Sequence, residues 1–214
     1  KKKAWALSLM GQRYERGIGL NQSYEMAKRL WEQAAQQGNV SAMYNLGVMY
    51  GNGQGVEQSY ERAKEYHELA AQQGFADAMT QLALLYANGL GVEQSYEKAK
   101  EWYAKAADLG HVSAMFNLAL LYKNGRGVEQ SYEKAKEYYE HAAHLGDTSA
   151  MTHLGLMYFD GSGVEQSYKK AFEYYEPAAH LGYAKAQTNL GVLYIRGDGV
   201  ERSPTKAREM FVKA

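Results

Sequence analysis

The sequence predicts an all-α fold, a solenoid of about six αα-hairpins, and three observations support this prediction. Apolar residues recur four positions apart, and glycine and serine stand where helices would end and begin. A ten-residue phrase, clearest at Gly91–Lys100, also recurs with a period of 36 residues. Such a period is typical of repeat proteins, in which stacked neighbours bury a shared core. Near-identical copies begin at Gly55, Gly127 and Gly163, and degraded copies begin at Gly19 and Gly199.

The period divides the chain into modules of one kind, so we expect a single repeat domain over residues 1–214. The opening Lys1 is not an initiator methionine and falls inside a repeat, so we interpret the chain as a piece of a longer protein or an engineered one. The approximate repeats are 3–38, 39–74, 75–110, 111–146, 147–182 and 183–214.

The first helix of each repeat, residues 41–51 in the second, is predicted by columns spaced i, i+4 and i+8, which form one stripe of an α-helix. Between the second and third columns every repeat has glycine or alanine, as at Gly47, which would let another helix approach closely. The three columns are Ala42, Ala78, Ala114, Ala150 and Ala186, then Leu46, Leu82, Leu118, Leu154 and Leu190, then Tyr50, Tyr86, Tyr122, Tyr158 and Tyr194.

A loop containing Gly-x-Gly, such as Gly53 and Gly55, is predicted to end this helix, because glycine suits the left-handed position after a helix. The next helix is expected to begin after a serine cap such as Ser59. The last copy reads Ser203-Pro204, and proline is favoured directly after a cap. The register of the helix is therefore supported by a residue that the other copies lack.

The second helix of the second repeat carries Ala63, Tyr66, His67 and Ala70 and is expected to close at Gly74. No hairpin can bury its apolar stripe alone, and we expect the tyrosine column to join each repeat to its neighbours. The apolar Phe211 lies on the last second helix with nothing after it, so contacts with another copy are possible there.

Composition excludes several classes of function. The chain has 24 basic and 24 acidic residues, a balance that argues against nucleic-acid binding. It has no cysteine, which excludes disulfides and thiolate metal sites. No apolar run approaches the ~18 residues of a membrane span, so we expect no direct membrane insertion. The compartment stays undetermined.

The repeated pattern resembles the Sel-1-like repeat family, relatives of the tetratricopeptide repeat. That resemblance implies αα-hairpins stacked in a right-handed superhelix, with the first helices lining its concave surface. It also implies adaptors that assemble protein complexes and are not enzymes in themselves. The constant period and loop of this chain depart from the family and indicate recent duplication or consensus-type design. The residues that carry the match in the second repeat are Ala42, Met43, Leu46, Gly47, Tyr50, Gly53, Gly55, Val56, Ala63, Ala70, Ala71 and Gly74.

Three columns lie on the first helices away from the core stripe, and we hypothesise that they form a peptide-binding groove. One column is apolar where a merely soluble helix would be polar, and one is mostly amide, able to bond a peptide's N–H and C=O together. The alternative is that the apolar column packs between adjacent helices and the amides only solvate the face. The columns are Tyr44, Thr80, Phe116, Thr152 and Thr188; Asn45, Gln81, Asn117, His153 and Asn189; and Val48, Leu84, Leu120, Leu156 and Val192.

Other candidate chemistry has a simpler interpretation. The Gly-x-Gly pairs follow helices and not strands, so they indicate helix caps and not phosphate loops. The repeated serines are caps and not nucleophiles. A zinc site including His144 and His180, one repeat apart, is conceivable, but we interpret the histidines His67, His111, His141, His144, His153 and His180 as solvated.

The sequence therefore favours a non-enzymatic scaffold that binds a protein or peptide segment on the first helices, without a cofactor. Self-assembly through the terminal repeats, and an engineered repeat scaffold, stay open as alternatives. An enzyme or zinc-dependent module is the least favoured class.

Overall fold

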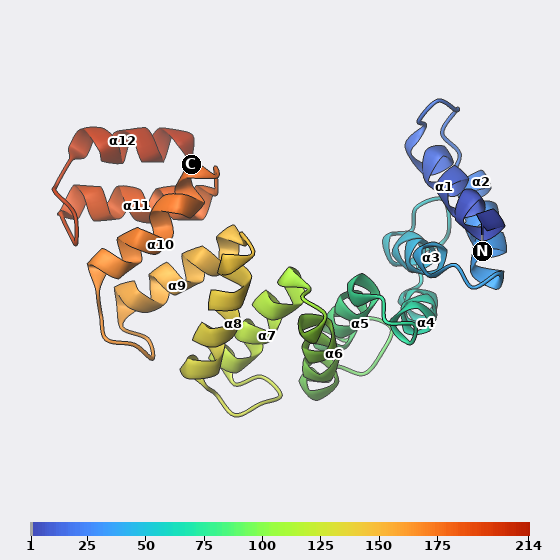
Figure 1. Ribbon diagram of the computed structural model, residues 1–214, viewed down its shortest axis with the longest axis horizontal. Coiled ribbons are helices and arrows are strands. Elements are labelled where there is room, and N and C mark those ends of the chain that lie inside the picture. The colour runs from blue at the N-terminus through green and yellow to red at the C-terminus, as the bar shows by residue number, and fades with distance from the viewer. Residues whose placement is uncertain (1) are drawn as a thin grey trace. The chain divides into compact units, whose positions relative to one another are not determined.

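The computed structural model describes residues 2–214, which form twelve α-helices and no strands (Figure 1). This confirms the all-α solenoid of helix pairs. Contacts divide the chain into two compact units of three repeats each, which we describe separately. Unit 1 extends to His111 and holds α1 (Lys2–Arg16), α2 (Tyr24–Gln36), α3 (Val40–Asn52), α4 (Tyr60–Ala71), α5 (Ala76–Asn88) and α6 (Tyr96–Asp108).

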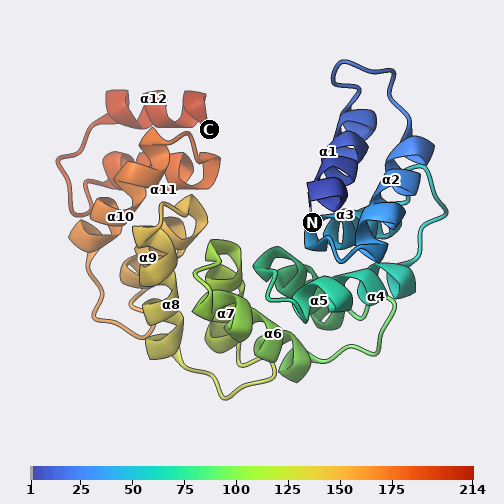
Figure 2. The same ribbon diagram turned by 45° about the vertical axis from the view of Figure 1, so that its right-hand side comes forward.

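Unit 2 begins at Val112 and repeats the same plan. Within each unit, successive helices contact one another in chain order, so that hairpin stacks on hairpin (Figure 2). Among residues 2–214 no helix combines the length and apolar character needed to cross a bilayer. The helices of unit 2 are α7 (Val112–Asn124), α8 (Tyr132–His144), α9 (Thr148–Asp160), α10 (Tyr168–His180), α11 (Ala184–Arg196) and α12 (Pro204–Lys213).

The predicted stripe of the first helices forms the core. Ala42 and Leu46 are fully buried, and their counterparts in the four later repeats are buried too, whereas Met10 of the first repeat is exposed. In unit 1 one buried cluster joins Ala27 and Trp31 of α2 to Ala42, Leu46 and Met49 of α3. Adjacent repeats within a unit are therefore joined by shared apolar clusters, as expected of a solenoid in which no hairpin is stable alone.

The small residue of each first helix accommodates an aromatic ring from the second helix of the same repeat. A Cβ atom added to Gly47 would lie 2.5 Å from Cε1 of His67, and one added to Gly191 would lie 2.6 Å from Cε1 of Phe211. Where the small residue is glycine, the predicted close approach is thus made by a ring whose atoms lie where a Cβ would otherwise be. The ring column is Trp31, His67, Tyr103, Tyr139, Tyr175 and Phe211.

The tyrosine column packs inside each hairpin and also joins neighbouring repeats, as expected: Tyr194 of α11 contacts Phe172 of α10 in the preceding repeat. Tyr50 of α3 stacks on Tyr66 of α4 with ring centroids 5.7 Å apart and planes 7° apart. In unit 2, Tyr158 stacks on Tyr174 in the same way. A cation from the second helix covers the first ring of each pair, as Arg62 covers Tyr50 and Lys170 covers Tyr158.

The loops between the two helices confirm the predicted caps. The Ser59 hydroxyl accepts a hydrogen bond from the Arg62 N–H, and Ser203 caps α12, whose first residue is Pro204. Gly53 ends α3 in the left-handed conformation with φ +67°.

The second glycine of the loop packs against the preceding repeat. Gly55 has φ +69°, and a Cβ atom there would collide with Cβ of Tyr24 at the start of α2. Gln58 of the same loop donates from Nε2 to the Gly51 carbonyl, 2.7 Å away, and so satisfies an acceptor at the end of α3. The near-constant loop therefore has a structural explanation.

Candidate functional site

The fifteen residues of the three predicted groove columns, hereafter the groove residues, lie on α3 and α5 of unit 1 and on α7, α9 and α11 of unit 2. Their apolar column, Val48, Leu84, Leu120, Leu156 and Val192, is half-buried along its whole length. These side chains are neither sealed in the core nor fully exposed. The alternative of inter-helix packing thus accounts for part of their surface, and the remainder is open to a ligand.

Unit 1 has a cleft of about 560 Å³ on this face. It lies between α3 and α5, and Ala63 and His67 of α4 also line it. Its lining includes four groove residues that the sequence singled out: Tyr44, Val48, Gln81 and Leu84. The remaining lining side chains are aliphatic, amide or phenolic, and none carries a formal charge at pH 7 when His67 is neutral.

His67 is the polar group of this cleft with unused hydrogen-bonding capacity. Its side chain is only 3% exposed, and Nδ1 has no hydrogen-bond partner. The Tyr44 ring lies against it, with centroids 5.6 Å apart. Burial lowers the pKa of His67 to about 4, because the charged imidazolium would lose its hydration. At neutral pH the ring is therefore uncharged, and its Nδ1 is buried against α3 at Gly47 without a partner.

Unit 2 has a smaller cleft of about 320 Å³ between α9 and α11. Five of its six lining residues were predicted: Thr152, His153, Leu156, Thr188 and Asn189. The sixth is Lys185, whose charge makes this cleft chemically different from the one in unit 1. Both clefts thus lie on the predicted face, and each combines aliphatic with amide or imidazole groups.

Beside the unit 2 cleft, aromatic rings fill the space between helices. Phe116 contacts both Tyr139 and His153, and the Tyr139 and His153 rings stack with centroids 5.3 Å apart. Burial, more than the hydrogen bond to the Ser149 carbonyl, sets the pKa of His153 and lowers it. Phe116 and His153 therefore belong partly to the packing between repeats.

The amide column is already engaged in internal hydrogen bonds, which restricts the predicted amide ladder. Asn117 donates to the Ser113 carbonyl at 2.8 Å, so it bonds its own helix. Gln81 bonds Tyr44 and Asn189 bonds Tyr175, across successive repeats. Asn45 differs, because its Nδ2 is buried without a partner. A ligand that used the other amides would have to replace existing bonds.

Two predicted groove residues are buried. Thr80 donates to the Ala76 carbonyl and contacts His111, and Thr152 donates to the Thr148 carbonyl. Thr188 makes the same bond to its own helix, with Ala184, but is exposed. The contact set proposed below therefore omits Thr80 and Thr152.

The histidines do not share one environment. His141, His144 and His180 are exposed, as interpreted from sequence, whereas His67 is buried and His153 is largely so. The sequence signal that could have identified His67 is its column, which holds tryptophan, tyrosine or phenylalanine in the other five repeats. Within residues 2–214 no three potential ligand side chains of the His or carboxylate type gather as they would around a metal ion.

Comparison with known proteins identifies the repeat. The Sel1 repeat family matches six times, at residues 6–39, 40–75, 76–111, 112–147, 148–183 and 184–214. No protein with a curated description matches the chain.

Among solved structures, a protective antigen of uropathogenic Escherichia coli with an SLR fold is 32% identical with a TM-score of 0.93, over 98% of this chain and 45% of that one. This chain therefore spans less than half of that relative. A Sel1 repeat protein from Oxalobacter formigenes is 30% identical with a TM-score of 0.90, over 99% of this chain and 85% of that one. An immunity protein from Pseudomonas aeruginosa, 22% identical with a TM-score of 0.58 over 99% and 76%, shares the fold alone.

Proposed function

This chain belongs to the Sel1 repeat family, and from that premise we propose that it is a non-enzymatic scaffold that binds a protein or peptide segment on the first helices of its repeats. Sel1 repeat proteins are generally protein-interaction scaffolds and are typically non-catalytic. The proposed contacts are Tyr44, Asn45, Val48, Gln81 and Leu84 in unit 1, and Phe116, Asn117, Leu120, His153, Leu156, Thr188, Asn189 and Val192 in unit 2.

The observation that carries the proposal is the unit 1 cleft with His67 in its lining. An apolar side chain of the ligand would contact Val48 and Leu84, and burying it there would contribute on the order of 1.5–3 kcal/mol. Next to this apolar surface, the amides of Asn52 and Gln81 in the lining would bond a neutral N–H or carbonyl of the ligand. An apolar surface with a few convergent polar groups is the usual composition of a ligand site.

The lining also restricts what can bind. Because its groups are uncharged at neutral pH, a charged ligand residue would lose its hydration without gaining a partner of opposite charge. The ligand of this cleft is therefore an uncharged stretch of a partner protein. Its affinity should change little with salt, since no exposed ion pair would be screened.

The test is an array of short neutral peptides probed with the purified chain and with Leu84→Asp. Peptides that occupy the cleft should lose most of their affinity for Leu84→Asp, because the new carboxylate would be desolvated against them. Leu69→Asp is the matched control, since Leu69 is 47% exposed on α4 and does not line the cleft. Undiminished binding to Leu84→Asp would place the ligand elsewhere and overturn the proposal.

A second variant protects this test against simple unfolding. If circular dichroism shows that Leu84→Asp loses its helices, Val48→Thr, which keeps the shape of the half-buried side chain, takes its place. Leu156→Asp tests whether a peptide binds in the separate cleft of unit 2, which Leu156 lines. A peptide that requires Leu84 and tolerates Leu156→Asp would assign the interaction to unit 1.

Self-assembly is a second candidate, supported by apolar exposure on the terminal helices. Phe211 of α12 is 44% exposed, although Tyr175 in the same column is 1% exposed, and Trp5 of α1 is 64% exposed. These side chains would be covered if two copies stacked end to end. Light scattering of the 214-residue chain should then show mass rising with concentration, and Val212→Glu should reduce that rise.

A further inference from the structure

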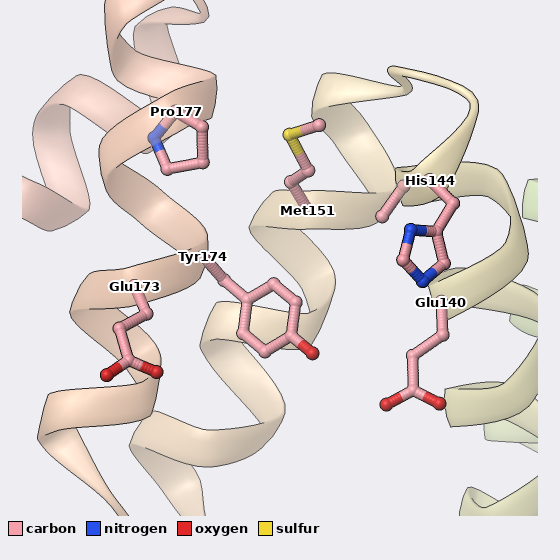
Figure 3. A pocket seen from close by; sticks show the side chains of 7 residues that line it. Glu140, His144, Met151, Glu173, Tyr174 and Pro177 are labelled. Atoms are coloured by element: carbon pink, nitrogen blue, oxygen red, sulfur yellow. The ribbon is translucent and has the colours of Figure 1, made fainter.

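A third pocket lies away from the groove residues, on the second helices of unit 2 (Figure 3). It has a volume of about 460 Å³ and is formed by α8 and α10, with Met151 of α9 between them in this view. Its lining shares no residue with the groove. The lining residues are Glu140, Ala143, His144, Met151, Glu173, Tyr174 and Pro177.

The lining combines apolar surface with two carboxylates. Met151, Pro177 and the Tyr174 ring supply the apolar part, and Glu140 and Glu173 flank Tyr174 (Figure 3). Glu140 pairs with Lys136 at 3.3 Å, whereas Glu173 makes no ion pair with any side chain between residues 2 and 214. Burial raises the pKa of Tyr174, and the negative charge of Glu140 adds to that effect. The pocket is therefore suited to a cation with an apolar stem.

Unit 1 holds such a cation at the equivalent positions. Counting back two periods, Glu173, Tyr174 and Pro177 correspond to Glu101, Trp102 and Lys105. The Lys105 ammonium lies 4.2 Å from the centroid of the Trp102 ring. An ammonium over an aromatic face is attracted by the negative charge density of the ring. In unit 2 proline replaces this lysine, and the cation nearest to Tyr174 is Lys136 of α8, which is already paired with Glu140. Glu173 is left without a cation of its own among the side chains of residues 2–214.

Proline at this position also frees an acceptor. Pro177 lies inside α10 and has no N–H, so the Glu173 carbonyl receives no hydrogen bond from the residue four positions later. That carbonyl belongs to a residue that lines the pocket. An ammonium group with three donors could bond a carboxylate and this carbonyl together.

From these observations we propose that the pocket is a docking site for a lysine side chain of a partner protein. The ammonium bonds Glu173 and lies near Glu140, and the methylenes pack on Tyr174 and Met151. The partner thus supplies in unit 2 the group that Lys105 supplies within unit 1. This site lies outside the groove of the proposed function, and neither one depends on the other.

The test is a titration of ¹³C-methyl-methionine-labelled protein with Nα-acetyl-lysine methylamide, followed by the NMR signal of the Met151 methyl group. The expected result is a saturable shift with this probe and none with the norleucine analogue, which has the same stem without the ammonium. Glu173→Gln should weaken binding up to about fivefold, as loss of an exposed ion pair does. Equal binding of the norleucine analogue, or no shift with lysine, would overturn the proposal.

Pro177→Lys is the sharper variant, because it places an internal lysine where unit 1 has Lys105 and also restores a helix N–H. It should abolish the lysine-dependent shift while keeping the helical signal, and undiminished binding would contradict the proposal. Glu101→Gln in unit 1 is the matched control and should leave the Met151 titration unchanged. Leu84→Asp should also leave it unchanged, which separates this site from the groove.

Discussion

The two units place different rings in the same column, and this difference decides where each unit is open. In unit 1 the ring over Gly47 is His67, which is small and lines the 560 Å³ cleft. In unit 2 the column holds Tyr139, Tyr175 and Phe211, and Tyr139 packs with Phe116 and His153. The comparison indicates that the size of a ring on the second helix is one determinant of how open the face of the first helices is.

The pocket formed by α8 and α10 also depends on one variable side chain, in a different column. Lys105 covers Trp102 in unit 1, whereas Pro177 leaves room next to Tyr174 in unit 2. In both cases the caps and loops are alike in the two units, and one variable side chain opens or fills a space. The constant residues thus maintain the repeat, and the variable ones provide chemistry.

The largest expected effect is a difference in the free energy of unfolding between alanine variants of the two rings, Tyr139 and His67. Tyr139→Ala should lower the free energy of unfolding by about 3–5 kcal/mol, because it removes a fully buried aromatic ring. His67→Ala should cost much less, since the ring is smaller and its Nδ1 is buried without a partner. Urea unfolding measures both. Tyr139→Phe is the matched control and should be nearly neutral, because the Tyr139 hydroxyl also lacks a partner; equal costs for the two alanine variants would break the comparison.

The next largest effect is a loss of folding stability at acidic pH. The pKa of His67 is about 4 in the folded chain and ~6.5 when unfolded, so between these values the unfolded chain binds more protons. The stability associated with neutral His67 is therefore present above pH ~6.5 and is lost as pH falls towards 4. His67→Phe should remove this loss, which is at most about 3 kcal/mol. Urea unfolding of both proteins at pH 7 and pH 4 measures it, and parallel losses would show that His67 titrates normally.

The smallest effect tests what the units have in common. Gly53→Ala in unit 1 and Gly161→Ala in unit 2 should each cost about 1–2 kcal/mol, because both glycines end a helix in the left-handed conformation. Thermal unfolding should show similar losses for both. Gly51→Ala is the control, since its Cβ would only reach ordinary contact with Ala63, and it should be neutral or stabilising. Unequal losses at Gly53 and Gly161 would mean that the two loops are not equivalent.

Much of the fold could be predicted, because the signals are local and repeat in every copy. The period set the number of hairpins, the serine caps set the starts of the second helices, and Ser203-Pro204 fixed the register of the last one. The first helix of the second repeat extends one residue further at each end than predicted, which is within the usual fraying of helix ends.

The site was less predictable, because it depends on which side chains meet across helices. Periodicity placed Val48 and Leu84 on one face of the first helices, where the unit 1 cleft lies, but could not show that Gln81 bonds Tyr44 or that Thr80 turns back to its helix carbonyl. Treating His67 as one of several solvated histidines was wrong, because its column is set by the packing of rings on Gly47 and not by polarity. The pocket formed by α8 and α10 was not predicted, because Pro177 occurs in one repeat only and gives no periodic signal.

The contact of the second loop glycine with the previous repeat has a consequence for how such a chain can change length. Gly55 contacts Tyr24 and Gly91 contacts Tyr60 in unit 1, and Gly199 contacts Tyr168 in unit 2, so the junctions within each unit share one contact. A gene rearrangement that inserts or deletes a whole 36-residue module leaves these junctions matched, wherever the breakpoints fall within the module. A rearrangement out of phase would separate a glycine from its tyrosine, so selection would retain lengths that are multiples of the module.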